Sequence, residues 1–166
     1  MQPFGLKPIF AALSFTVFIL FVGNASFAQG SSKIEITVGR LTADRSGDSV
    51  FQVKLGNKVL FESEVEYGSI KAAFPKRKPT IIVLSIGECR LTCAASFYVV
   101  DVSKSQPAIS KGFGNCSPKA KITFRHQTLN VKFPDGSKIP AEDSGAYRYG
   151  AAETWTYRSG KLRKLN

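Results

Sequence analysis

A two-residue alternation of polar and apolar side chains constrains the fold of this chain more than any other feature of its sequence. Residues 33–38 alternate Lys, Glu and Thr with Ile, Ile and Val, which on a β-strand places the three apolar side chains on one face. Similar strand patterns continue to the C-terminus, separated by residues typical of turns. No window of a dozen residues keeps a 3.6-residue period, and only residues 67–74 suggest a short helical turn. The sequence therefore predicts a fold built from β-strands.

Hairpin patterns and two continuous apolar runs define the expected architecture. Hairpins are predicted within residues 50–65, 121–133 and 153–165, whereas residues 80–86 and 94–102 are largely apolar throughout. A strand that is apolar on both sides is covered on both faces, so we expect these two runs to be central strands. We predict an all-β fold, an antiparallel β-sandwich or incomplete barrel of about eight to ten strands.

The first of these hairpins is compatible with two loop lengths. A three-residue loop at 56–58 places Leu55 opposite Val59 and Val53 opposite Phe61. A two-residue loop pairs Leu55 with Lys58 instead. We expect the longer loop, because it puts the apolar side chains of both strands on the same face. A separate turn is predicted upstream, where five polar or glycine residues follow one another: Asp44, Arg45, Ser46, Gly47 and Asp48.

The N-terminal segment has the composition of a secretory signal peptide. Lys7 supplies a positive charge, residues 9–23 are an unbroken apolar or small run, and residues 26–28 form a small-x-small cleavage site. An uncleaved anchor is the alternative, although the run is short for a membrane span. We expect a signal peptide at 1–28, a single β domain at 29–166, and a periplasmic or secreted protein.

The three cysteines, Cys89, Cys93 and Cys116, are expected in an oxidising compartment. A hairpin centred between residues 104 and 105 places Cys93 directly opposite Cys116, so these two can form a cross-strand disulfide. Pairing Cys89 with Cys116 needs the turn two residues earlier, in apolar strand sequence, and Cys89–Cys93 would close a three-residue loop. We favour Cys93–Cys116, with Cys89 as a covered thiol or one that pairs between molecules. The spacing supports neither a redox motif nor a zinc site.

The sequence around these cysteines resembles small exported proteins of proteobacteria. The stretch Gly87-Glu88-Cys89-Arg90-Leu91-Thr92-Cys93-Ala94-Ala95 precedes a strand, and Gly112-Phe113-Gly114-Asn115-Cys116-Ser117 is similar to the Phe-Gly-x-Cys-Ser turn of that group. The resemblance implies a Gram-negative periplasmic setting and the Cys93–Cys116 pairing, and it implies no activity. Cys89 departs from the two-cysteine pattern of the group.

Motifs for catalysis are lacking in this sequence. The single histidine, His126, is expected at an exposed hairpin tip, and no hydrolase or phosphate-binding motif is present. Glu142 and Asp143 are adjacent, so on a strand they would point to opposite faces and could not act as a glycosidase pair. Other carboxylates are interpreted as the solvated side of an amphipathic strand: Glu62, Glu64 and Glu66. We expect a protein that is not an enzyme and that has no cofactor and no metal.

Charge is the strongest functional signal, with 23 Lys and Arg residues against 12 Asp and Glu. Residues 29–75 are balanced, so the excess lies within residues 76–166. One basic cluster lies between Pro75 and Pro79, which lack backbone donors and favour an exposed loop. A second cluster surrounds the last hairpin. Together they form the predicted binding surface: Lys76, Arg77, Lys78, Arg158, Lys161, Arg163 and Lys164.

These basic clusters have two interpretations. They either solvate the protein and protect its edge strands, or bind lipopolysaccharide phosphates, peptidoglycan carboxylates or an acidic protein. Nucleic acid is a disfavoured partner, because export removes the protein from it and the pair Trp155 and Tyr157 is expected to fill a core or cover a sheet rather than to stack on bases. We predict an exported, non-enzymatic β-domain binding module for an anionic envelope component or acidic protein. The alternative is a periplasmic inhibitor or immunity protein that blocks an enzyme or toxin.

Overall fold

The computed structural model describes residues 32–36, 39–46, 50–64, 67–87, 93–136 and 149–165. Within these residues the chain forms twelve strands in three antiparallel sheets of four, which are not closed into a barrel. The predicted all-β sandwich class is confirmed, although the strands outnumber the eight to ten expected. The predicted signal peptide at 1–28 lies outside the described residues. Among those that are described, no helix is long and apolar enough to cross a membrane.

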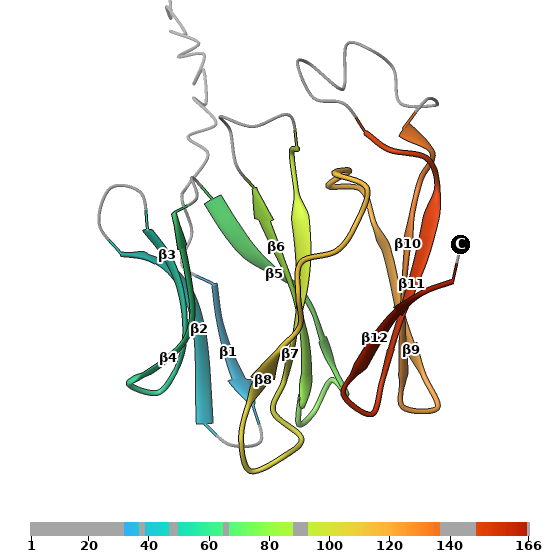
Figure 1. The fold of residues 1–166 in the computed structure, drawn as a ribbon. Helices are drawn as coiled ribbons and strands as arrows, with labels where there is room; N and C mark the ends of the chain where they lie inside the picture. Colours follow the sequence, from blue (N-terminus) through green and yellow to red (C-terminus); the bar gives the residue numbers. More distant parts are fainter. Residues whose placement is uncertain are drawn as a thin grey trace, which may run out of the picture.

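The three sheets follow one another along the chain, and Figure 1 shows the central sheet between the other two. The first sheet contains β1 (Ser32–Ile36), β2 (Gly39–Ser46), β3 (Val50–Leu55) and β4 (Lys58–Glu64). The central sheet contains β5 (Tyr67–Phe74), β6 (Ile81–Gly87), β7 (Ser96–Asp101) and β8 (Ala108–Ile109). The third sheet contains β9 (Lys121–Arg125), β10 (Thr128–Phe133), β11 (Glu153–Arg158) and β12 (Lys161–Lys164), in the order β12-β11-β10-β9.

The central sheet is covered on both faces, as its two apolar runs predict. Every residue of β6 is buried. Because side chains alternate along a strand, Ile82 and Leu84 pack in the core shared with the first sheet, whereas Ile81 and Val83 pack in the core shared with the third. Burial of each such side chain stabilises the fold by about 2 kcal/mol. One strand therefore contributes to two cores.

β5 reaches both cores by means of a β-bulge. Ile70 is paired with Leu84 and Ala72 with Val83, so Lys71 is the extra residue. Ile70 packs in the first core and Ala72 in the second, although regular alternation would put both on one face. The helical turn suggested for residues 67–74 is wrong, since strand pairing with β6 satisfies this segment's backbone.

The loop length predicted for the β3–β4 hairpin is also wrong. Leu55 is paired with Lys58 across a two-residue turn, in which Gly56 has a φ of 59°. The expected pairing of Val53 with Phe61 is nevertheless present, because the register shifts between Val53 and Lys54. A bulge in β4 thus restores the apolar register that the short turn would have lost.

The remaining turn predictions have mixed outcomes. The turn predicted at 44–48 begins too early, because residues 44–46 belong to β2 and pair with β3. The two hairpins of the third sheet are confirmed, with tight turns at residues 126–127 and 159–160. In the central sheet Val100 lies opposite Ile109, which is the predicted register of a hairpin centred between residues 104 and 105.

The topology sends alternate turns to opposite ends of the stack. The turns that follow β3, β5, β7, β9 and β11 lie at the lower end in Figure 1, which we call the hairpin end. β2, β4, β6 and β10 run the other way and end at the upper end. Loops from all three sheets are therefore neighbours at the hairpin end, although they are far apart in the sequence.

Candidate anion-binding surface

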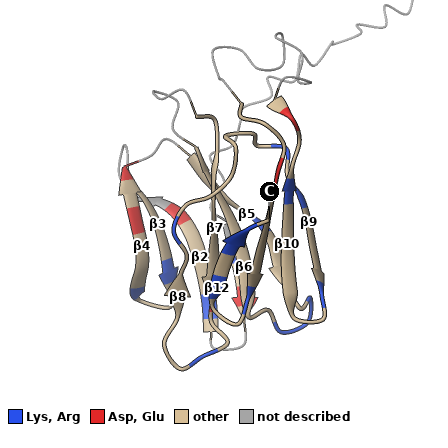
Figure 2. Cartoon of the chain, turned by 45° about the vertical axis from the view of Figure 1, so that its right-hand side comes forward, with Lys and Arg blue, Asp and Glu red and all other residues tan. Residues whose placement is uncertain are grey.

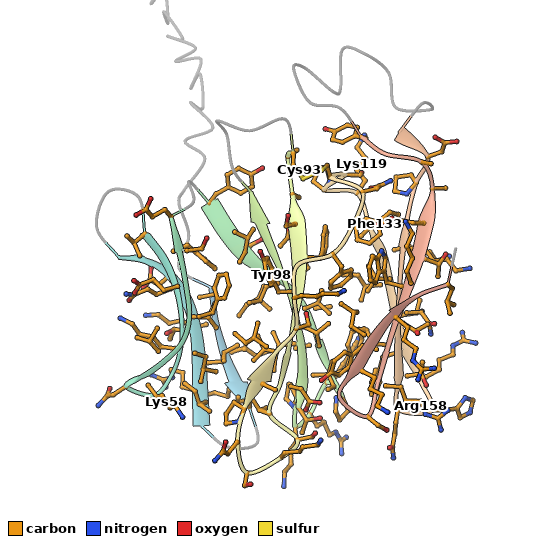
Figure 3. All side chains as sticks on the ribbon, viewed as in Figure 1. Lys58, Cys93, Tyr98, Lys119, Phe133 and Arg158 are labelled. Atoms are coloured by element: carbon orange, nitrogen blue, oxygen red, sulfur yellow. A yellow bond between two sulfur atoms is a disulfide. The ribbon has the colours of Figure 1, made fainter. Side chains whose placement is uncertain are left out.

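The outer face of the third sheet, which is turned away from the central sheet, is polar along β9, β10 and β11. The inward side chains of these strands pack in the second core, and Figure 3 shows Phe133 among them, with Arg158 pointing away from the stack. Alternation places the intervening residues on the outer face. Six are exposed cations, which we call the basic face: Lys121, Arg125, Lys132, Arg158, Lys161 and Arg163.

Strand register places like charges opposite each other on the basic face. Lys121 of β9 is paired with Lys132 of β10, and Arg158 of β11 is paired with Lys161 of β12. Directly opposed side chains are about 5 Å apart at Cβ, and like charges at such positions destabilise a sheet. The one acidic residue of β9–β12, Glu153, is buried on the inner side of this sheet. Folding by itself does not favour this arrangement.

Uncharged hydrogen-bonding side chains lie between the cations. Thr123 of β9, Asn130 of β10 and Thr156 of β11 follow one another across the sheet, and the row ends at Arg163. Successive outward positions on a strand are about 7 Å apart and neighbouring strands about 4.8 Å apart, so the face measures roughly 14 Å in each direction. Charged rows thus lie on either side of a polar row that is neutral from Thr123 to Thr156, which we call the neutral row.

The hairpin end adds further cations beside this face. Lys76, Arg77 and Lys78 are exposed in the β5–β6 loop, as the flanking prolines predict, although Pro79 itself is buried. In the β7–β8 loop, Lys104 approaches the β11–β12 turn, since its Nζ lies 3.6 Å from where a Cβ on Gly160 would be. Figure 2 shows many of the Lys and Arg residues towards this end of the stack and others on β9 and β10, whereas most of the acidic residues lie nearer the opposite end.

The structure separates the seven predicted binding residues into three groups. Lys76, Arg77 and Lys78 belong to the hairpin end, and Arg158, Lys161 and Arg163 belong to the basic face. Lys164 differs from both, because its Nζ lies 2.6 Å from Oε2 of the buried Glu153. The other carboxylate oxygen of Glu153 accepts a hydrogen bond of 2.7 Å from Trp155 Nε1. Lys164 therefore neutralises an internal carboxylate.

Sequence reasoning missed the half of the basic face that lies on β9 and β10. Lys121, Arg125 and Lys132 are scattered among apolar residues, so they do not form a cluster in the sequence. The signal that could have found them is alternation combined with hairpin register, because together these predict which side chains share the solvent face.

A disulfide and a buried amide organise the upper end of the second core. Cys93 and Cys116 are bonded, as expected, with a Cα–Cα distance of 4.7 Å; Cys89 lies outside the described residues. Asn115 is buried, and its Nδ2 donates to the carbonyl oxygens of Pro134, Gly150 and Ala151 at 2.6, 3.2 and 3.1 Å. Its Oδ1 accepts from the Ser117 amide at 3.1 Å. This network joins the Phe-Gly-x-Cys-Ser turn to the ends of β10 and β11.

A hydrogen-bonded carboxylate–tyrosine pair, Asp101 of β7 and Tyr157 of β11, joins the central sheet to the third sheet near the hairpin end. Tyr157 donates to Asp101 Oδ2 at 2.8 Å, and Asp101 Oδ1 accepts from Ser103 N and Oγ at 2.9 and 2.6 Å. Burial opposes ionisation of Asp101, but the hydrogen bonds from Ser103 and Tyr157 and the charge of Lys104 outweigh it and lower its pKa. Burial and the Asp101 interaction raise the pKa of Tyr157, so it remains a donor.

The structure also locates several of the other residues that the sequence offered as candidates for function. His126 is exposed at the β9–β10 tip, and Glu62 and Glu64 are exposed on β4, both as expected. Glu66, Glu142 and Asp143 fall outside the described part of the chain. Trp155 and Tyr157 face the second core, which agrees with their predicted packing role. Among the residues that the structure describes, no three His, Cys, Asp or Glu side chains gather in a way that could hold a metal ion.

Comparison of the chain with protein-family models, with curated proteins and with solved structures finds no match.

Proposed function

We propose that the protein is an exported, non-enzymatic binding module that docks on an anionic component of the cell envelope or on an acidic protein. The observation that carries this proposal is the gathering of cations from separate hairpins at one end and on one face of the fold. Such a surface attracts anionic partners over a distance set by ionic strength. A binding role also agrees with the absence of catalytic motifs from the sequence.

Two further observations support an exported module. The Cys93–Cys116 disulfide is stable in an oxidising compartment such as the periplasm. The basic residues of the β5–β6 loop are exposed and lie outside both cores, so a partner could meet them without disturbing the packing of either core. Intact-mass measurement on a periplasmic fraction is expected to find a chain that begins at Gln29. Recovery of the full-length chain in the membrane pellet would contradict export as a soluble module.

The binding proposal is tested by reversing the loop cations Lys76, Arg77 and Lys78 to Glu. The matched control reverses three cations of the first sheet, Lys33→Glu, Arg40→Glu and Lys54→Glu, and changes the net charge by the same amount. We expect the loop variant to lose capture on purified peptidoglycan sacculi or lipopolysaccharide, and to lose the salt dependence of that capture, while its thermal midpoint stays near that of the parent. The control should bind as the parent does.

Equal loss of capture in the loop variant and in the control would mean that net charge alone acts, without a site. Unchanged capture in both would reject the loop as a binding element. An unfolded loop variant would show that the loop is structural, and circular dichroism of each purified variant distinguishes that outcome.

A further inference from the structure

We infer that the basic face is a docking surface for a linear acidic polysaccharide, whose carboxylates meet the two charged rows while its hydroxyl groups meet the neutral row between them. This inference rests on the proposed binding function and names its site and partner class. The site differs from the β5–β6 loop, because Lys121 and Lys132 lie on β9 and β10 at the end of the sheet that is away from the hairpin turns.

Two like-charge pairs on the basic face indicate that it receives an anion. Lys121 opposite Lys132 and Arg158 opposite Lys161 each raise the free energy of the folded sheet. The first sheet shows that the fold allows the favourable arrangement, since Glu35 lies opposite Arg40 there and the two form an ion pair. An anionic ligand placed between the like-charged side chains would turn each repulsive pair into two attractive contacts.

The neutral row indicates what kind of polyanion fits the basic face. Thr123, Asn130 and Thr156 offer hydroxyl and amide groups, which donate and accept hydrogen bonds with sugar hydroxyls. Single-stranded nucleic acids are bound through stacked aromatic side chains, yet Trp155 and Tyr157 of this sheet face the core. Membrane-surface binding uses apolar side chains inserted among the lipids. Leu165, just beyond β12, is the one large exposed apolar residue among the described residues of the third sheet.

The size of the basic face sets the length of ligand that can contact all of its cations. Four strands give a surface of roughly 14 Å in each direction, with the charged rows at its upper and lower borders. A ligand must be long enough to reach both rows before all the cations contribute. The affinity per binding site is therefore expected to rise with the length of the polysaccharide until the ligand spans the face, and to stay constant for longer ligands.

The test uses alginate oligomers of increasing length, with neutral dextran as the sugar control, in isothermal titration calorimetry at low salt. The informative variant is Lys132→Glu, and its matched control is Lys54→Glu on the outer face of the first sheet. We expect Lys132→Glu to weaken alginate binding at least tenfold and Lys54→Glu to leave it within twofold. Because Lys132→Glu creates an opposite-charge pair with Lys121, its thermal midpoint should not fall. Lost binding with undiminished stability separates recognition from folding.

Every other outcome rejects at least one part of the two proposals. If Lys132→Glu binds alginate as the parent does while the β5–β6 loop variant loses capture on sacculi, the basic face is rejected and the proposed function stands. If neither variant changes any binding, both proposals fail. If the parent ignores alginate but binds phosphatidylglycerol vesicles in a Lys132-dependent way, the face recognises a lipid surface and the polysaccharide is wrong. Equal binding to dextran would exclude a charge-based site.

Discussion

The first and third sheets flank the same central sheet, yet they meet solvent in opposite ways. On the first sheet, opposed residues complement one another, as in the ion pair of Glu35 with Arg40 and the hydrogen bond from Gln52 to Glu62. On the third sheet, Lys121 is opposed by Lys132. Two sheets of equal strand number and similar apolar inner faces can thus have different outer charge. The difference indicates that outer charge is set by a requirement other than folding.

The two interfaces of the central sheet differ in a related way. The first is an apolar core with one close aromatic pair, Phe61 and Tyr98, whose ring centroids are 5.0 Å apart. The second contains several aromatic contacts, among them Phe97 with Phe133 at 5.0 Å. It is also crossed by polar interactions of Asn115 and of Asp101. The third sheet is therefore attached by directional bonds in addition to apolar burial, which fixes the orientation of the basic face.

Removal of the Asn115 amide, which belongs to the second interface only, is expected to cause the largest loss of stability. Asn115→Ala removes the side-chain donor to three carbonyl groups, of which Gly150 O keeps a second donor in Gly136 N, and it removes the acceptor for Ser117 N. Because four hydrogen bonds of a buried amide are lost together, we expect a loss of about 3 kcal/mol in the free energy of unfolding. Urea denaturation measures it. Asn130→Ala, on the outer face of the same sheet, should stay within about 0.5 kcal/mol. Equal effects for both would show that the second interface does not depend on this network.

The Asp101–Tyr157 pair predicts that attachment of the third sheet depends on pH. Asp101→Asn should cost about 2 kcal/mol at pH 7, because the charged acceptor of several hydrogen bonds is lost. The pKa of Asp101 is lower in the folded protein than the ordinary value of about 3.9, so its ionised form stabilises the fold above that value. This contribution disappears as pH falls through the folded-state pKa. The gap between parent and variant should therefore close below about pH 4 in urea titrations, and a gap independent of pH would contradict the assignment.

Lys164 and Arg163 test whether all cations of β12 have the same role. Lys164→Met removes the partner of the buried Glu153 carboxylate and should destabilise the protein by roughly 1.5 kcal/mol, a value reduced because the lysine is half exposed. Arg163→Met changes a solvent-facing side chain and should stay within about 0.5 kcal/mol. Thermal unfolding compares the two. If Arg163 proves the more important for stability, the division of these residues into structural and surface groups is wrong.

Substitutions in the β9–β10 turn are expected to have the smallest effect on the stability of the protein. His126 and Gln127 have φ angles of 48° and 58°, a left-handed conformation that favours Asn and Gly. The double variant His126→Asn, Gln127→Gly should stabilise the protein by about 1 kcal/mol. It should leave alginate binding unchanged, because neither residue belongs to the basic face. Calorimetric unfolding and titration of the same sample give both values, and a change in affinity would extend the binding surface to this turn.

Local patterns predicted much of the fold. Alternation identified the hairpins of the third sheet, and the apolar run of β6 predicted a strand covered on both faces. Hairpin register also favoured the Cys93–Cys116 disulfide. Predictions failed where a single residue shifts the register, as at Lys71 and in the β3–β4 hairpin. A bulge gains its stability from core contacts across the sheet, which no local pattern contains.

The sequence by itself determined the strand pattern, the charge imbalance between the two parts of the chain, and the exposed loop of Lys76, Arg77 and Lys78. Only the tertiary structure decided that Lys121, Lys132 and Arg158 share one face and that Lys164 serves a buried carboxylate. The physical reason is that charge is a property of residues, whereas a binding face depends on the register between strands and on which side of each strand is covered. Those depend on contacts between segments that are distant in the sequence.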